Sequence, residues 1–166
     1  LNNLNALVTA RNILGLETDP DASFIISKEA HVSFEKCRKI LGLKKENIIT
    51  VDTNPYGIMD CIKLEEELDK NLKFGKKVFA IVATLGTTIT GSIDPISDIS
   101  KICKDRNIWL HIDGSIGGIF SMFNSNIKNY GDVSNSDSIT INPQKVLGIT
   151  KTSSLLIVKD VNTLKE

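Results

Sequence analysis

Two spacings of apolar residues run along the chain. Residues 2–14 carry leucine or alanine at every third or fourth position, the period of an α-helix, and Gly15 follows as a stop signal. The run 78–83 is almost wholly apolar, as expected for a strand that is covered on both faces. By the same criteria the sequence predicts further helices at 32–42, 62–72 and 95–106, and further strands at 24–26, 48–51, 108–112, 138–141 and 155–158.

Strands and helices alternate along most of the chain. Repeated strand–helix–strand units predict an α/β fold with an open, mostly parallel sheet and helices on both faces. The last two strands are joined by a turn at Asn142-Pro143 without a helix, so we expect them to pair antiparallel. Asp94 is the candidate N-cap of the helix that Pro95 begins, and the stretch 117–132 is ambiguous. The chain has no linker or internal repeat, which predicts one globular domain or part of one.

Composition narrows the classes of partner. The 166 residues include 20 basic and 20 acidic side chains, so net charge gives no reason to expect nucleic acid or an anionic membrane as a partner. No apolar run approaches the roughly 20 residues that span a bilayer. The three cysteines form no C-x-x-C pair, which favours a reducing cytosol over a disulfide framework. We therefore expect a cytoplasmic protein with no nucleic-acid or membrane partner.

Polar residues follow three of the predicted strands. They are Thr87-Thr88, Asp113, and the segment 142–145, which reads Asn-Pro-Gln-Lys. Ligands of open α/β sheets bind in the crevice at the carboxyl ends of the strands. The sequence therefore predicts that these residues line one ligand-binding crevice.

The motifs of nucleotide and metal sites are absent or incomplete. No G-x-G-x-x-G follows a strand, and the glycine spacing of 86–92 resembles a P-loop but has Ser92 where the lysine must stand. His31 and His111 are far apart in sequence, so no metal site is predicted. A carboxylate, a lysine and hydroxyls in one crevice suit pyridoxal 5'-phosphate (PLP). Its aldehyde forms an imine with a lysine, and a carboxylate keeps its pyridine nitrogen protonated.

Four segments carry a family resemblance. They are HVSFEKCRKILGL (31–43), VATLGTTITGSIDPISDI (82–99), IWLHIDGSIGG (108–118) and DSITINPQKVLGITKTSSLLIVKD (137–160). Together they resemble the group II PLP-dependent amino-acid decarboxylases, which include glutamate, aromatic amino-acid, histidine and diaminobutyrate decarboxylases. The resemblance runs almost from end to end, with the motifs in family order. It implies the three-layer fold of the large domain of the aspartate aminotransferase superfamily, known as fold type I.

The resemblance also implies roles for single residues. Lys145 matches the lysine that forms the imine with PLP, and Asp113 matches the aspartate that pairs with the pyridine nitrogen. His31 matches the histidine that stacks on the ring. Thr88 matches a threonine beside the cofactor, and Asn142 an asparagine on its phosphate side.

The sequence departs from the family pattern at two places. Gln144 stands where many members have histidine; it can still donate a hydrogen bond to the phosphate or the cofactor, but it cannot titrate. Gly114-Ser115 replaces the usual pair of alanines after the aspartate, and we expect this change to loosen the packing under the ring.

Structural roles compete with these assignments. His31 is also placed to begin a helix, with Ser33 helping to cap it, and Asp113 could merely cap a following turn. His111 lies in the middle of a strand and is expected in the core. Gly117-Gly118 is expected to permit a close approach of two backbone segments.

The function that the resemblance implies is PLP-dependent decarboxylation of an L-amino acid, performed by a homodimer. Two alternatives stay open. One is another fold-type I enzyme, such as a carbon–carbon lyase that acts on phosphorylated amino alcohols. The other is a non-catalytic remnant that serves as a dimerisation or regulatory module.

The first residues suggest how much of the domain is present. LNNLNALVTARN (1–12) resembles the helix that follows the family's glycine-rich phosphate-binding turn. We therefore expect residues 1–166 to form part of the PLP-binding large domain, truncated at both ends, and to be inactive when expressed alone.

Overall fold

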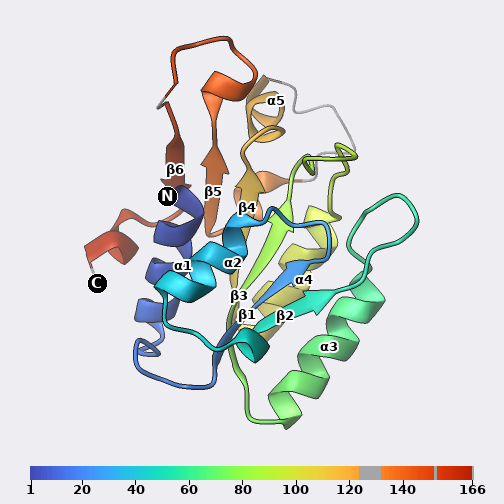
Figure 1. Cartoon of the computed structure of the whole chain (residues 1–166), viewed down its shortest axis with the longest axis vertical. Helices are drawn as coiled ribbons and strands as arrows, with labels where there is room; N and C mark the ends of the chain where they lie inside the picture. The colour runs from blue at the N-terminus through green and yellow to red at the C-terminus, as the bar shows by residue number, and fades with distance from the viewer. Residues whose placement is uncertain (124–131, 152, 166) are drawn as a thin grey trace.

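The computed structural model describes residues 1–123, 132–151 and 153–165, which form one six-stranded sheet with helices on both faces (Figure 1). The strands are β1 (Ala22–Ser27), β2 (Ile48–Val51), β3 (Lys77–Thr84), β4 (Trp109–Gly114), β5 (Ser138–Ile141) and β6 (Leu155–Val158). The main helices are α1 (Asn2–Ile13), α2 (Ser33–Ile40), α3 (Cys61–Lys73), α4 (Ile96–Arg106) and α5 (Gly118–Phe123). Each predicted helix and strand is present, and the bounds agree with the predictions to within two residues.

The strand order is β2-β1-β3-β4-β5-β6. The first five strands of this order pair in parallel, and β6 pairs antiparallel with β5, as predicted from the turn at Asn142-Pro143. β3 lies at the centre, and all of its residues except Lys77 are buried, because helices cover it on both sides. The predicted mostly parallel α/β sheet is confirmed.

Two apolar cores lie on the two faces of the sheet. On one face, α1 and α2 cover a core built on three aromatic side chains. Phe24 packs against Phe34 and Phe79, with ring centroids 6.5 and 5.8 Å apart. On the other face, α3, α4 and α5 pack leucine, isoleucine and cysteine side chains against the apolar side chains of the strands in a second core. The helices therefore hold the sheet rigid from both sides and leave its carboxyl edge free for a ligand.

The structure corrects the expected role of Asp94 and confirms that of Gly117. Asp94 does not cap α4: Pro95 occupies the N-cap position, and the Asp94 carboxylate accepts hydrogen bonds from the backbone N–H groups of Met59 and Thr84. Gly117 does permit a close approach, because a Cβ there would lie 2.3 Å from the carbonyl oxygen of Leu85. In the ambiguous stretch 117–132, α5 occupies the first part, and residues 124–131 lie outside the described residues.

None of the helices in the described parts of the chain combines the length and the apolar character needed to cross a membrane.

Candidate active site

The carboxyl ends of three neighbouring strands carry a row of polar side chains. Thr84 on β3 is in register with Asp113 on β4, which is in register with Thr140 on β5. Adjacent strands lie about 4.8 Å apart, so the three side chains stand next to one another on one face of the sheet. They line a cleft of about 180 Å³. This cleft lies where the strand-end rule predicts a ligand.

Five of the six predicted site residues line this cleft: His31, Thr88, Asp113, Asn142 and Lys145. Gln144 is not among its lining residues. The side chain of Gln144 is half-buried, and its Oε1 accepts a hydrogen bond of 3.4 Å from Ser153 Oγ. Residues 143–145 form a single turn of 3-10 helix, in which successive side chains point about 120° apart. Gln144 and Lys145 therefore point in different directions, and a role for Gln144 stays a prediction.

The Asp113 side chain is the only acidic group among the described lining residues of the cleft. It is 5% exposed and accepts three hydrogen bonds, from Asn3 Nδ2 (2.8 Å), Ser115 Oγ (2.6 Å) and the Ser115 backbone N–H (3.2 Å). No lysine or arginine of the described residues pairs with it. A buried carboxylate without a cation is costly, and a cationic ligand would relieve that cost.

Three buried hydroxyl groups in the lining of the cleft have no hydrogen-bond partner within the described residues. They are Ser33 Oγ, Thr84 Oγ1 and Thr140 Oγ1. Buried polar atoms in native proteins are nearly always paired with protein, water or ligand. Their position in one cleft with a carboxylate and an amine indicates a polar ligand.

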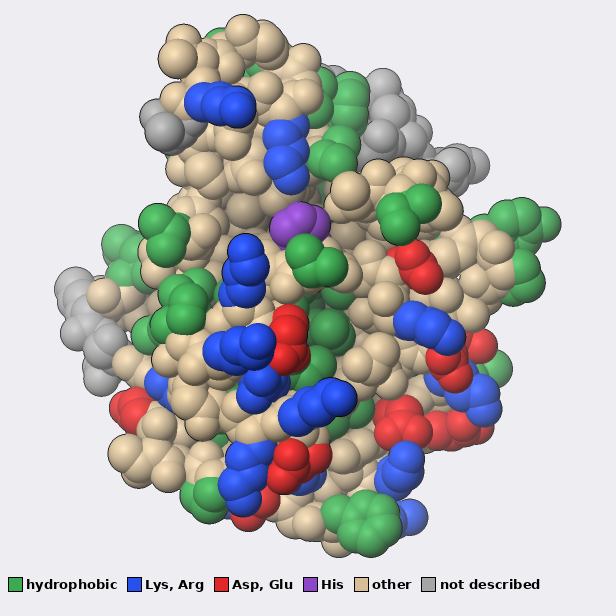
Figure 2. Space-filling model, viewed as in Figure 1, with side chains coloured by type: hydrophobic (Ala, Val, Ile, Leu, Met, Phe, Trp, Pro, Cys, Tyr) green, Lys and Arg blue, Asp and Glu red, His purple; other side chains and the backbone are tan. Residues whose placement is uncertain are grey.

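His31 is exposed and reaches the cleft from the start of α2. Figure 2 shows a histidine side chain (purple) at the surface of the visible face. His31 is exposed, whereas His111 is fully buried. His31 Nδ1 accepts the backbone N–H of Ser33 at 3.2 Å, so the neutral ring carries its proton on Nε2. Ser33 does not cap the helix as expected, since its Oγ has no partner in the described structure.

Lys145 ends the short helix that follows β5. Its side chain is exposed, and no described acidic side chain lies within ion-pair distance of its amine. The turn before it is fixed by Pro143 and by a hydrogen bond of 2.5 Å from Ser154 Oγ to Asn142 Oδ1. Asn2 of α1 donates to the same Ser154 Oγ at 2.8 Å, which joins the turn to the opening helix. These bonds thus anchor the turn that carries Lys145, and the side chain of Lys145 is left exposed.

Thr88 lies in the loop that follows β3, and a hydroxyl cluster holds this loop in place. Thr87, Thr90 and Ser92 bond to one another at 2.6 to 2.9 Å, and the Ser92 hydroxyl donates to the carbonyl of Tyr56. Thr88 is left exposed and faces the cleft. Thr87 and Thr90 therefore shape the turn, and Thr88 is available to a ligand.

Asp94 holds the end of β3, where the polar row begins, through hydrogen bonds to the backbone. It is 1% exposed, and burial raises the pKa of its carboxyl to about 6, although the N–H groups of Met59 and Thr84 act in the opposite direction. One of these bonds, 2.7 Å long, fixes the backbone of Thr84 at the end of β3. Asp94 is thus a structural support of the polar row rather than a helix cap.

The raised pKa of Asp94 predicts a pH dependence of stability. The folded protein holds the Asp94 proton to a higher pH than the unfolded chain, so the free energy of unfolding falls as the pH rises from 3.8 to about 6. The difference between these pKa values corresponds to about 3 kcal/mol. Asparagine does not titrate, so the free energy of unfolding of Asp94→Asn should not fall in this way. Measured by urea unfolding, it should rise by up to that amount relative to the free energy of unfolding of the original protein between pH 4 and pH 7. Asp105→Asn, on the exposed side of α4, should show no such change; an equal change in both variants would contradict the prediction.

Gly114 does not loosen the packing, contrary to expectation. A Cβ at Gly114 would lie 3.0 Å from the Thr140 carbonyl oxygen and 3.1 Å from Ile139 Cδ1, so no space is left open there. Ser115 adds a hydroxyl bond to Asp113 that an alanine could not make. This departure from the family pattern therefore increases the number of hydrogen bonds to the carboxylate.

Sequence reasoning missed several polar residues of the cleft: Asn3, Ser33, Thr84, Ser115, Thr140 and Ser154. A signal for two of them was present. Thr84 and Thr140 are the last or next-to-last residues of apolar runs that point toward the same edge as Asp113. A signal for Asn3 was present as well: it lies at helical spacing from Ala6, Leu7 and Ala10, on the buried face of α1, and it is 9% exposed.

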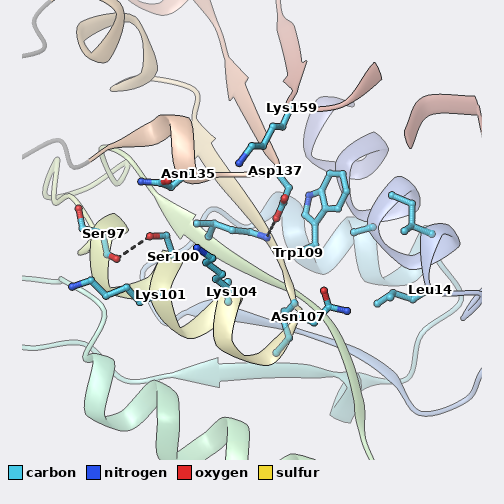
Figure 3. Close-up of a pocket in the computed structure, with 15 residues that line it drawn as sticks. Leu14, Ser97, Ser100, Lys101, Lys104, Asn107, Trp109, Asn135, Asp137 and Lys159 are labelled. Atoms are coloured by element: carbon cyan, nitrogen blue, oxygen red, sulfur yellow. Dashed lines mark hydrogen bonds between the residues drawn. The ribbon is translucent and has the colours of Figure 1, made fainter. Parts of the chain in front are cut away.

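A larger cavity, of about 580 Å³, lies at the opposite edge of the sheet, where β4 begins (Figure 3). Its cations are Lys101, Lys104 and Lys159, all exposed. Asp137 there accepts the backbone N–H of Leu110 at 2.8 Å. The larger cavity lies away from the carboxyl ends of the parallel strands and contains none of the predicted site residues, so the smaller cleft is the better candidate for chemistry.

Comparison with known proteins places the chain in a family. The family described as "pyridoxal-dependent decarboxylase conserved domain" matches residues 21–166. Human acidic amino acid decarboxylase GADL1 is 35% identical over 90% of the chain, which covers 29% of that protein. A glutamate decarboxylase-like protein of Gibberella zeae is 34% identical over 98% of the chain, which covers 32% of that protein. The chain thus spans about a third of the length of these curated relatives.

Solved structures agree with this comparison. The glutamate decarboxylase domain of a diaminobutyrate–pyruvate transaminase and L-2,4-diaminobutyrate decarboxylase from Vibrio parahaemolyticus is 28% identical. It superimposes with a TM-score of 0.92 over 99% of this chain and 38% of its own. Mouse CSAD is 27% identical, with a TM-score of 0.91 over 98% of this chain and 36% of its own. The sheet therefore has the architecture of fold type I, and the chain belongs to the pyridoxal-dependent decarboxylase family.

Proposed function

We propose that the protein that carries this chain is a PLP-dependent decarboxylase of an L-amino acid, and that residues 1–166 form part of its cofactor-binding large domain. The observation that carries the proposal is the meeting of Asp113 and Lys145 in one cleft at the carboxyl edge of the sheet. Family membership supports the cofactor and the reaction class.

The donors and acceptors of the cleft fit PLP. Asp113 is a buried acceptor with no cation beside it in the described structure, which suits a protonated ring nitrogen. The unpaired hydroxyls of Thr84 and Thr140 flank it on either side, where they can bond to polar substituents of a ring. Lys145 offers an accessible primary amine, the group that an aldehyde needs.

Each side chain then has a task that its position supports. Lys145 would hold the cofactor covalently and release it when the amine of the substrate takes its place. Asp113 would keep a negative charge against the ring nitrogen, and the Nε2–H of His31 would point away from the Ser33 backbone toward the ligand. Thr88 and Asn142 would contact the cofactor, and a contact from Gln144 would need a turn of its side chain.

When bound, PLP supplies an electron-poor ring that takes up the electron pair left behind by departing carbon dioxide. The contribution of Asp113 is electrostatic. Its fixed charge lies in a buried site with little reorganisation to undergo, and such preorganised groups stabilise developing charge far better than water does.

We further propose a homodimeric, cytoplasmic protein. Two large apolar side chains next to cleft residues are strongly exposed: Val32, beside His31, at 74% and Ile89, beside Thr88, at 87%. A second subunit that covers them would also close the cleft. The free state of Cys37, Cys61 and Cys103 is in keeping with a reducing compartment.

Covalent capture of the cofactor tests the proposal. The purified protein is incubated with PLP, reduced with borohydride and digested, and we expect the mass of the reduced cofactor on the peptide that contains Lys145. Amino acids of different side-chain class are then assayed for release of carbon dioxide above that of free PLP. Capture on another lysine would refute the role of Lys145, and formation of an aldehyde without carbon dioxide would refute decarboxylation.

A further inference from the structure

A line of hydrogen bonds runs behind Asp113, away from the cleft. Asn3 Nδ2 donates to Asp113 Oδ2 at 2.8 Å, and Asn3 Oδ1 lies 3.1 Å from His111 Nε2. His111 Nδ1 lies 2.9 Å from Ser138 Oγ, which also accepts the indole N–H of Trp109 at 2.8 Å. His111 is in the core, as predicted, yet its ring links the core to the site.

The direction of every bond in this line is determined. A carboxylate only accepts, so the amide nitrogen of Asn3 must face Asp113 and its oxygen must face His111. That oxygen also only accepts, so His111 carries a proton on Nε2. Burial lowers the pKa of His111, with the Asp113 charge acting in the opposite direction, so the ring is neutral and Nδ1 is bare. Nδ1 then accepts the hydroxyl proton of Ser138.

Every donor in this line is electrically neutral. A lysine or arginine in the place of Asn3 would also hold the carboxylate, but it would cancel the charge of Asp113. The amide of Asn3, fixed by the neutral imidazole of His111, holds the carboxylate without neutralising it. The negative charge of Asp113 can then interact with a cationic ligand. The lone pairs support this reading: Ser115 occupies both positions on Oδ1, and Asn3 occupies one on Oδ2. One lone pair of Oδ2 is left.

We propose that Asn3, fixed by His111, is a positioning residue that orients Asp113 and keeps one lone pair of Oδ2 open for the ring nitrogen of the cofactor. This inference rests on the proposed function and extends it to two residues that do not touch the reacting atoms. It assigns α1 a part in the chemistry of the site, through a polar side chain on the buried face of that helix.

The test compares Asn3→Leu and Asn3→Asp with the matched control Asn5→Leu, which lies on the exposed side of α1. Leucine keeps the size of Asn3 but removes both bonds, and aspartate keeps the shape but replaces the donor by an acceptor. Both Asn3 variants should lower kcat about 10- to 100-fold, the scale found when groups that orient a metal ligand are removed. The KM for the amino-acid substrate should change little in these two variants. Asn5→Leu should have the kcat and KM of the original protein.

A double variant separates positioning from a general structural defect. If Asn3 acts through Asp113, then Asn3→Leu should cost almost nothing further in a protein that already carries Asp113→Asn. Fully multiplicative losses in the double variant, or an equal loss in Asn5→Leu, would overturn the proposal.

Two measurements do not depend on turnover. In protein with ¹⁵N-labelled histidine and no PLP, NMR at neutral pH should show His111 as a neutral ring protonated on Nε2. The Kd for PLP should rise about tenfold in Asn3→Leu. A charged ring or a proton on Nδ1 would overturn the positioning role even in an active decarboxylase. Conversely, the expected ring state and PLP affinities in a protein that releases no carbon dioxide would refute only the proposed reaction.

Discussion

Replacing Lys145 by arginine is expected to lower turnover by about 10⁴-fold or more, the scale seen when a covalently acting residue is removed. Arginine keeps the positive charge and much of the length of lysine. Its guanidinium stays protonated at any physiological pH, so it cannot attack an aldehyde. The loss therefore measures the covalent role of the amine and not its charge. The same variant should carry no reduced cofactor on the 142–151 segment after borohydride treatment.

Lys151→Arg is the matched control, because Lys151 lies exposed in the same connection between β5 and β6 and outside the cleft. It should keep the turnover and the labelling of the original protein. Near-normal turnover of Lys145→Arg, or equal losses in both variants, would show that Lys145 does not hold the cofactor.

Asp113→Asn is expected to have the second-largest effect, a loss of about 10²- to 10³-fold in kcat, or roughly 3 to 4 kcal/mol of transition-state stabilisation. The substitution preserves shape, so the sheet should stay folded. It removes the negative charge that would pair with the protonated ring nitrogen. It also brings an amide N–H toward the donors that hydrogen-bond to the carboxylate of the original protein. PLP should still bind, because Lys145 is unchanged, and the visible absorbance of the bound cofactor should report it.

Asp105→Asn removes an exposed carboxylate from α4 and should leave both turnover and absorbance unchanged. If Asp113→Asn turned over at a near-normal rate, the carboxylate would not face the ring. If it failed to bind PLP at all, its role would be binding and not catalysis.

The sequence was sufficient to predict the main features of the site because they depend on local patterns. Asp113 and Lys145 each follow an apolar strand, and strands that run in parallel bring their carboxyl ends to one edge. The antiparallel pairing of β5 and β6 followed from the absence of a predicted helix between them. The residue types at that edge suggested PLP, and the family resemblance then implied a role for each residue.

The misses have a common physical origin in tertiary contacts. Asp94 precedes a proline and a helix, which favours an N-cap, but the N–H groups of Met59 and Thr84, distant along the chain or across a loop, bind its carboxylate instead. Asn3 lies three and four residues before Ala6 and Leu7, on the buried face of α1, but the helical period cannot tell that Asp113 and His111 surround its amide. Such partners are set by the packing of elements, which no short window of sequence contains.

The register of the sheet has a consequence for quality control of the protein. Thr84, Asp113 and Thr140 stand side by side only because β3, β4 and β5 pair without a slip. A shift of β4 by one residue would turn the Asp113 carboxylate into the apolar layer on the opposite face, at a large cost in free energy. Misassembled molecules would thus be both inactive and unstable, and would be preferred targets for proteolysis. Specific activity, normalised to protein mass, would then count the correctly paired molecules in any refolded sample.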